Sequence, residues 1–193
     1  MTSDRDSAPA TPMGSPPSST ITVLAIPADP AHPHRLVTVD PCDDAALKAL
    51  TGGGLEPVDL DRDGAVLWMA DPPLPAGTPR NDRATALAAF GPRRFHPDLQ
   101  IHGDVIITGL AYSDDVDLLD VPVSYARLLD APRYRVQIRH RHAAGWIVLG
   151  DAYPSLLSAY DATRVVADAT RRSRPTQWVS ARVTPVEATP PTR

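Results

Sequence analysis

Three consecutive glycines at residues 52–54 constrain the fold more than any other feature, because one kind of structure must end there and another must begin. Residues 43–50 before them favour a helix, and glycine readily ends a helix by turning through positive φ. Residues 55–69 after them hold two apolar runs separated by a turn sequence at 61–64, which is typical of a β-hairpin. The sequence therefore predicts a helix that ends near Thr51 and a hairpin directly after it. A phosphate-binding loop would need the opposite order, with a strand before the glycines and a helix after them.

The rest of the first 130 residues alternates between short β-branched runs and helix-forming runs. Asn81 or Asp82 is placed to cap an alanine-rich helix, and the apolar run after Gly103 is typical of a buried strand. We expect strands over residues 21–26, 35–39 and 104–109, helices over residues 83–90 and 123–129, and an acidic loop over residues 114–120. This pattern predicts an α+β module with a mixed sheet and two or three short helices.

Residues 133–142 alternate between two kinds of side chain, as a half-buried strand does. Polar residues fall on one face and apolar residues on the other; the polar set is Arg133, Arg135, Gln137, Arg139 and Arg141. A turn at residues 143–145 leads into a second strand over residues 146–149, and Ser155 precedes a helix over residues 156–172. Residues 177–183 alternate again. The order β-β-α-β predicts a three-stranded antiparallel sheet with one helix on its apolar face.

Proline marks both ends of the chain and the joint between its two parts. Residues 1–20 and 187–193 hold too little apolar surface to offset chain entropy, so we expect them to be disordered tails. Ala131 and Pro132 form the joint. The chain is therefore expected to consist of two small α+β modules, residues 21–130 and residues 132–186.

The two parts carry opposite charge. Residues 1–130 contain 9 Lys and Arg against 19 Asp and Glu, whereas residues 131–193 contain 10 against 4. Such asymmetry indicates two modules with different partners, or two faces that attract each other. Among the basic residues 18 are Arg and one is Lys, so arginine abundance alone does not indicate a phosphate site.

The polar face of the second module combines arginine with tryptophan. Arginine contacts phosphate and stacks on planar groups, and indoles stack on bases, so this mixture is typical of nucleic-acid binding. The candidate DNA- or RNA-binding residues are Arg135, Arg139, Arg141, Trp178 and Arg182, with Trp146 between the strands. Three alternatives stay open: a face that is only solvated, a face that docks on the acidic module, and a protein-interaction adaptor that works through the acidic module.

Three short motifs of the first module, in order and spacing, carry a resemblance to a known family. They are Gly52-Gly53-Xaa-Xaa-Glu56, Asn81-Asp82-Arg83-Ala84-Thr85 and Gly103-Asp104-Val105-Ile106. Over about residues 21–112 the chain resembles domain of unknown function 3846, found in actinobacteria and their mobile elements. The resemblance implies a domain boundary and an accessory protein of a plasmid or phage. The family has no established activity.

An enzymatic site is the remaining alternative, with Glu56, Asn81 and Asp104 as its polar residues. No motif of a hydrolase or a kinase is present, so we expect a non-enzymatic protein without a cofactor. The run Asp59-Xaa-Asp61-Xaa-Asp63-Gly64 matches the start of a calcium-binding loop, but Ala70 stands where the bidentate Glu is required. No metal is expected.

Cysteine usage and hydropathy indicate the compartment. Cys42 is the single cysteine and cannot form an internal disulfide, which fits a reducing environment. Neither an apolar stretch of signal-peptide type at the N-terminus nor a run of 18 apolar residues occurs. We expect a cytoplasmic protein without membrane contact.

Overall fold

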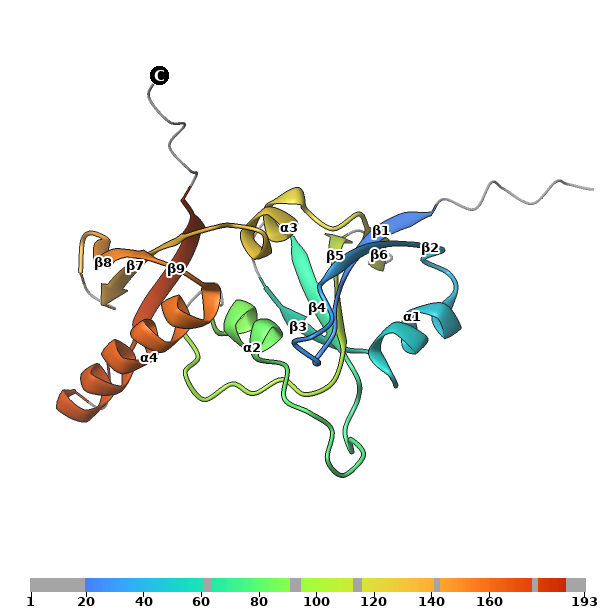
Figure 1. Ribbon diagram of the computed structural model, residues 1–193, viewed down its shortest axis with the longest axis horizontal. Coiled ribbons are helices and arrows are strands. Elements are labelled where there is room, and N and C mark those ends of the chain that lie inside the picture. The colour runs from blue at the N-terminus through green and yellow to red at the C-terminus, as the bar shows by residue number, and fades with distance from the viewer. Residues whose placement is uncertain are drawn as a thin grey trace, which may run out of the picture.

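The computed structural model describes residues 20–60, 64–90, 95–112, 116–140, 143–174 and 177–186. The expected α+β class is confirmed, since this part of the chain forms four helices, one six-stranded sheet and one three-stranded sheet. Figure 1 shows the larger sheet with α1 beside it and the smaller sheet with α4 at the opposite end of the molecule. Of the expected N-terminal tail, residues 1–19 lie outside the described residues, and so does the whole expected C-terminal tail, residues 187–193.

The larger sheet has the strand order β2-β1-β5-β4-β3, and β6 pairs with β5. Its strands are β1 (Ile21–Ile26), β2 (Arg35–Val39), β3 (Glu56–Asp59), β4 (Ala65–Met69), β5 (Val105–Tyr112) and β6 (Val116–Leu119). A mixed sheet was expected, but every pair of neighbouring strands is antiparallel. The expectation was wrong because strand direction depends on which distant segments pair, and the sequence pattern of one strand does not reveal its partner.

Strand β6 also corrects the expectation of a loop over residues 114–120. The acidic composition of residues 114–120 does not indicate a strand. The strand forms by pairing with β5, where Gly109 allows the β6 backbone to approach closely. A Cβ atom at Gly109 would lie 2.6 Å from the backbone oxygen of Asp120. The strand is therefore stabilised by a contact with β5 rather than by its own composition.

Alanine at Gly109 is expected to lower the free energy of unfolding by about 1–3 kcal/mol, because the added methyl group forces β5 and β6 apart. Urea unfolding measures the loss. Gly145→Ala is the matched control, since a Cβ there meets nothing within 4 Å. Equal stability of the two variants would contradict the close approach at Gly109.

The glycine run ends a helix as expected. Helix α1 (Asp44–Thr51) is capped by Asp43, whose side chain accepts a hydrogen bond from the backbone of Ala46. Gly52 ends it at a φ of 77°, and its N–H donates to the carbonyl of Lys48. The chain then enters the β3–β4 hairpin, whose expected turn at residues 61–63 lies outside the described residues.

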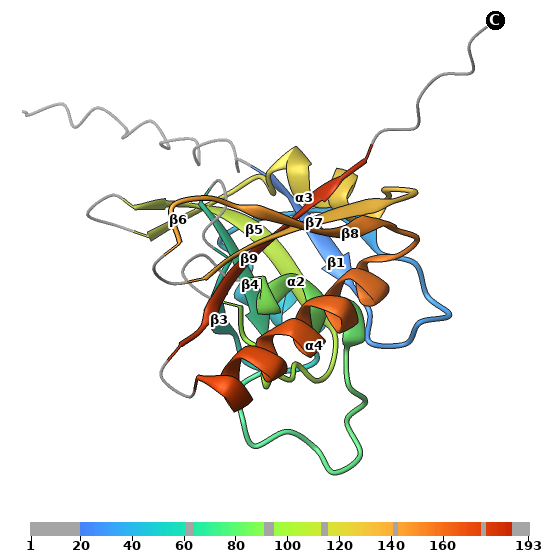
Figure 2. The ribbon, with the colours of Figure 1, turned by 90° about the vertical axis from the view of Figure 1, so that its left-hand side faces the viewer.

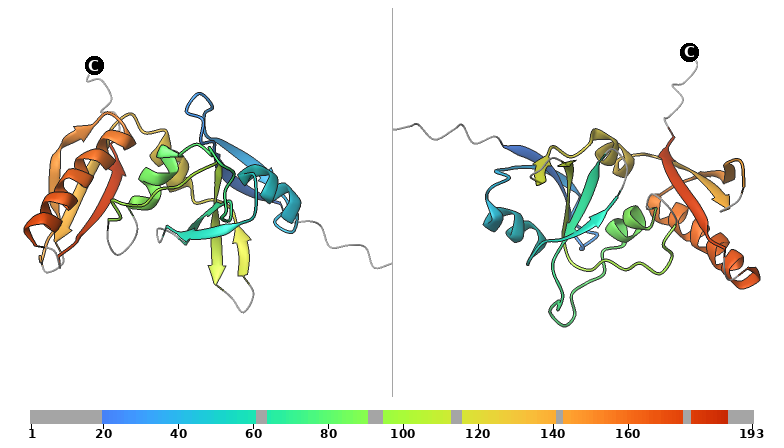
Figure 3. Two further views of the ribbon diagram at one scale, coloured as in Figure 1. Left: turned by 90° about the horizontal axis from the view of Figure 1, so that it is seen from below. Right: turned by 180° about the vertical axis from the view of Figure 1, so that it is seen from behind.

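Helices cover both faces of the larger sheet. Strand β1 divides its side chains accordingly: Val23 and Ala25 join the cluster under α1, while Leu24 and Ile26 join the main core. The main core includes residues of α2 (Asp82–Ala89) and α3 (Val123–Leu129), both close to the expected ranges. Figure 3 shows α2 between the two sheets.

The smaller sheet is the expected β-β-α-β unit, with the strand order β8-β7-β9. Its elements are β7 (Tyr134–His140), β8 (Ile147–Tyr153), α4 (Leu156–Ser173) and β9 (Val179–Pro185). Ser155 and Ser158 form a reciprocal capping box at the start of α4. Strand β8 runs past the expected Leu149 to Tyr153. Its register against β7 shifts between Leu149 and Tyr153, and Gly150, within this irregular stretch, has a φ of 62°.

One apolar core connects the two sheets. It contains buried residues of β7 and β9 together with buried residues of β1, β4, β5 and α2. At the junction, Phe95 lies between Phe90 and Tyr160, with ring centroids 5.3 Å and 5.7 Å apart. Figure 2 shows α4 in front of the smaller sheet, with α2 behind it. The division into modules at Ala131 and Pro132 stays a prediction, and the two parts pack against each other.

Candidate nucleic-acid interface

Strand β7 separates arginine from apolar side chains as its alternation indicates. Tyr134, Val136 and Ile138 are buried, whereas Arg135 and Arg139 are exposed on the other face. The buried face packs on α4, because a helix with an apolar stripe covers the apolar side of a small sheet. The strand therefore presents its two arginines away from the core.

The pairing of β7 with β9 brings Arg182 into the same group. Gln137 lies directly opposite Arg182 in the antiparallel register, between Arg135 and Arg139 on its own strand. The Nε of Arg182 donates a hydrogen bond to Oε1 of Gln137 at 2.7 Å. A neutral amide thus holds this guanidinium in place without cancelling its charge.

Trp146, just before β8, joins the two strands on this face. The Cζ atom of Arg139 lies 4.9 Å from the centroid of the Trp146 ring, and that of Arg182 lies 4.5 Å from it. Each such cation–π contact contributes about 0.5–1 kcal/mol at an exposed site. We call this set of Arg135, Gln137, Arg139, Trp146 and Arg182 the arginine face.

The charges of the arginine face are not neutralised within the described residues. There, Arg135, Arg139 and Arg182 form no ion pair, and strands β7 and β9 contain no acidic residue. Helix α4 differs: its Arg164 pairs with Asp161, and its Arg171 pairs with both Asp98 and Asp168. Three positive charges therefore remain available for an anionic ligand.

The structure does not assign two of the candidate residues to this face. Arg141 lies outside the described residues. Trp178 precedes β9 and lines a hollow with Ala167 and Arg171 of α4. The expected alternation of residues 177–183 places it with Arg182, but the regular strand begins only at Val179. Sequence reasoning also missed that Gln137 fixes Arg182, because the register of β7 against β9 is a property of the folded sheet.

The residues behind the family resemblance have structural roles. Gly52 ends α1, a side chain at Gly53 would press on Ala70, and Gly103 turns the chain with a φ of 77°. Asn81 is buried, caps α2 and donates to the carbonyls of Ile26 and Gly103. The carboxylate of Asp104 accepts a hydrogen bond from the N–H of Ala28. These interactions account for each of these residue types without a ligand.

The three polar residues of the enzymatic alternative are only partly brought together. The Asn81 amide donates to Gly103, which is adjacent to Asp104 in the chain. Glu56 is exposed on the edge strand β3, opposite Met69. The strand order places β3 two strands from β5, so Glu56 is about 10 Å from the β5 backbone at the usual strand spacing. The carboxyl group of Glu56 thus stands apart from the other two residues.

The part of the chain that the structure describes contains no group of three or more His, Cys, Asp or Glu arranged to hold a metal ion. Asp61 and Asp63 of the calcium-like run lie outside the described residues. No helix of the described chain has the length and apolar character needed to cross a membrane.

Comparison with known proteins adds no relative. No family model matches the chain, and no curated protein or solved structure matches it. The resemblance to domain of unknown function 3846 is therefore without support and stays a prediction.

Proposed function

We propose that this protein is a non-enzymatic, cytoplasmic nucleic-acid-binding protein that contacts its ligand through the arginine face. The observation that carries the proposal is the arrangement of three guanidinium groups, two of them stacked on Trp146, without a neutralising carboxylate among the described residues. The free, exposed thiol of Cys42 suits a reducing compartment. An accessory role in a plasmid or phage is part of the same proposal and rests on the family resemblance alone.

The spacing of the arginines suits a phosphate backbone better than a single anion. Arg135 and Arg139 are four residues apart on β7, a distance of about 13 Å along a strand. Arg182 lies between them on the neighbouring strand. A small anion would contact one guanidinium at a time, whereas a chain of phosphates can contact all three.

Trp146 holds the guanidinium groups of Arg139 and Arg182 over its ring, and a guanidinium plane can itself stack on a base. Stacking and phosphate contacts are both largely independent of base sequence, so the combination favours binding without strong sequence preference. A face that only interacts with water would not need two guanidinium groups held over one ring. The arrangement is therefore better explained by a ligand with both phosphates and planar bases.

Binding of a fluorescein-labelled oligonucleotide to the full chain, followed by anisotropy at several salt concentrations, tests the proposal. Three phosphate contacts predict that affinity for a single strand falls about 20-fold between about 50 and 200 mM salt. The Arg135→Ala/Arg139→Ala/Arg182→Ala variant is expected to bind more weakly and to lose most of this salt dependence.

The control is a variant with the same change in net charge on another surface. Arg35→Ala/Arg127→Ala/Arg164→Ala removes three exposed arginines from β2, α3 and α4. It is expected to retain most of the wild-type affinity. Equal losses in the two triple variants would mean that only net charge matters, and absence of binding by the wild type at low salt would overturn the proposal.

A further inference from the structure

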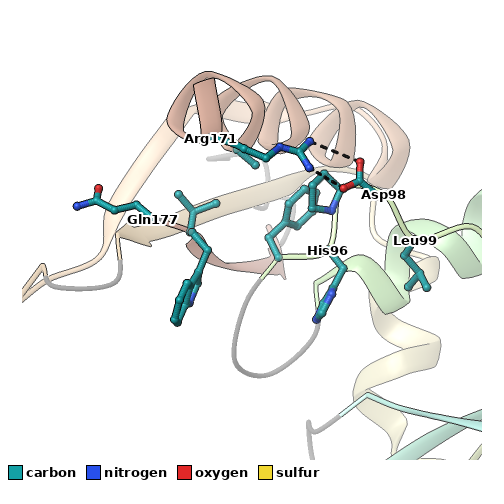
Figure 4. A pocket seen from close by; sticks show the side chains of 10 residues that line it. His96, Asp98, Leu99, Arg171 and Gln177 are labelled. Atoms are coloured by element: carbon teal, nitrogen blue, oxygen red, sulfur yellow. Dashed lines mark hydrogen bonds and ion pairs between the residues drawn. The ribbon is translucent and has the colours of Figure 1, made fainter. Parts of the chain in front are cut away.

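A hollow of about 340 Å³ lies between the start of the edge strand β9, the C-terminal half of α4 and residues 95–99. Its volume is within the range of small-molecule pockets, about 300–1,000 Å³. Figure 4 shows Arg171 joined to Asp98, with His96 below this pair in the view. We call this hollow the β9 pocket; the residues used below are Phe95, Asp98, Ala167, Arg171, Gln177 and Trp178.

Aromatic and polar groups line different parts of the β9 pocket. Trp178 is 36% exposed and supplies ring surface at the wall, whereas Phe95 is buried against Phe90 and Tyr160. Arg171 donates to Asp98 at 2.7 Å and to Asp168 at 2.6 Å, which neutralises and orients the guanidinium. The hydrogen bond from Arg171 lowers the pKa of Asp98, so its carboxylate remains an ionised acceptor. Gln177 adds an amide with donor and acceptor groups.

The walls of the pocket are held by bonds from other elements. The backbone N–H of Phe95 donates to the carbonyl of Val179 at 2.8 Å, which joins the two sides. The hydroxyl of Tyr160 donates to the carbonyl of Pro97 at 3.1 Å. A ligand would enter a pocket that is already formed, which limits the entropy lost on binding.

The pocket and the arginine face share strand β9. Trp178 comes directly before this strand, and Arg182 lies four residues further on, about 13 Å along an extended chain. Ser180, between them, is opposite Arg139 of β7. Because β9 is an edge strand of the smaller sheet, a ligand whose planar group entered the β9 pocket can pass around this edge, where its next phosphates would meet Arg182 and then Arg139.

These observations fit one ligand class. A nucleobase has apolar faces for stacking and an edge with donors and acceptors, which matches the Trp178 ring bordered by Gln177 and the Asp98 carboxylate. Bases in a duplex are paired and stacked inside the helix, so only an unpaired base reaches such a pocket. We infer that the β9 pocket receives one unpaired base of a single-stranded nucleic acid whose phosphates contact the arginine face. The inference rests on the proposed function and specifies its ligand as single-stranded.

Filling the pocket tests this inference in the full chain. Ala167→Leu adds bulk at the α4 wall without removing a polar contact, and leucine is a good helix former. Ala169→Leu makes the same change at an exposed position of the same helix and is the matched control. Anisotropy is measured with a labelled 12-nucleotide single-stranded DNA of mixed sequence and with its duplex.

We expect the wild type and Ala169→Leu to bind the single strand more tightly than the duplex. Ala167→Leu should weaken single-strand binding by about 5- to 150-fold, the effect of losing one base–aromatic stack, and should leave duplex binding unchanged. In parallel, adenosine monophosphate is titrated into ¹⁵N-labelled protein. The Trp178 indole resonance should shift in the wild type and not in Ala167→Leu.

The results of these experiments distinguish a failure of the pocket inference from a failure of the proposed function. If the wild type binds DNA in a salt-dependent way but Ala167→Leu behaves like Ala169→Leu, the pocket inference is wrong and the arginine-face proposal stands. The same conclusion follows if the indole resonance of Trp178 does not respond to the nucleotide. If the wild type binds neither the single strand nor the duplex, the proposed function is wrong and the inference falls with it.

Discussion

Alanine in place of Asn81 is expected to lower the free energy of unfolding by about 3 kcal/mol, because it removes a helix cap and the donor to two carbonyl groups, that of Ile26 in a buried contact and that of Gly103 in a part-buried one. Asn81 is 1% exposed, and its Oδ1 accepts the N–H of Ala84 at 3.0 Å to start α2. Its Nδ2 donates to Ile26 at 2.9 Å and to Gly103 at 3.0 Å. One side chain therefore connects a helix, the end of β1 and the turn before β5.

Urea unfolding measures this effect, and Asp43→Ala provides the comparison. Asp43 caps α1 in the same way but is exposed, so its loss is expected to cost only about 1 kcal/mol. Asn81→Asp separates the two roles of Asn81. The carboxylate can still cap α2, but an oxygen replaces the Nδ2 donor and faces the carbonyl oxygens of Ile26 and Gly103. Asn81→Asp is therefore expected to destabilise at least as strongly as Asp43→Ala. An Asn81→Ala loss no larger than that of Asp43→Ala would show that the buried donors contribute nothing.

Alanine at Tyr160 is expected to cost about 3–5 kcal/mol, as for other buried aromatic residues, and to destabilise both sheets together. Tyr160 is 5% exposed on α4, its ring packs on Phe95, and its hydroxyl donates to Pro97. Both partners precede the proposed joint at Ala131 and Pro132, so Tyr160 connects the two parts of the chain. Tyr160→Phe retains the ring and is expected to lose only about 1 kcal/mol.

Tryptophan fluorescence can follow each part of the molecule separately. A variant with only Trp68 reports on β4 of the larger sheet, and a variant with only Trp178 reports on the start of β9. Because the core is continuous, Tyr160→Ala should shift the urea midpoint of both reporters equally. Two separate transitions, with only the Trp178 reporter shifted, would instead support two independent domains.

Local signals in the sequence predicted most of the elements. A cap such as Asp43, a stop such as Gly52 and the alternation around Val136 all act within a few residues, so the chain reveals them without its tertiary structure. The same alternation predicted that Arg135 and Arg139 share a face. These parts of the fold and of the arginine face were accessible because their causes are short-range.

The features that sequence reasoning missed depend on distant contacts. Strand β6 forms against Gly109, and the smaller sheet shares its core with the larger one. The β9 pocket joins Asp98 to Arg171 across 73 residues, and neither residue belongs to a motif. Trp178 precedes the regular strand β9, so alternation alone does not fix the side of the sheet on which it lies. No single window of the sequence contains this information.

The positive charge of the arginine face comes from guanidinium groups alone. In proteins generally, the arginine side chain carries its positive charge across the physiological pH range. His140, at the end of β7, lines a separate recess with Thr170 and Ser173 of α4. Acidification would therefore leave the charge of this face unchanged, and a bound polyanion would be released by competing ions or competing strands rather than by protons.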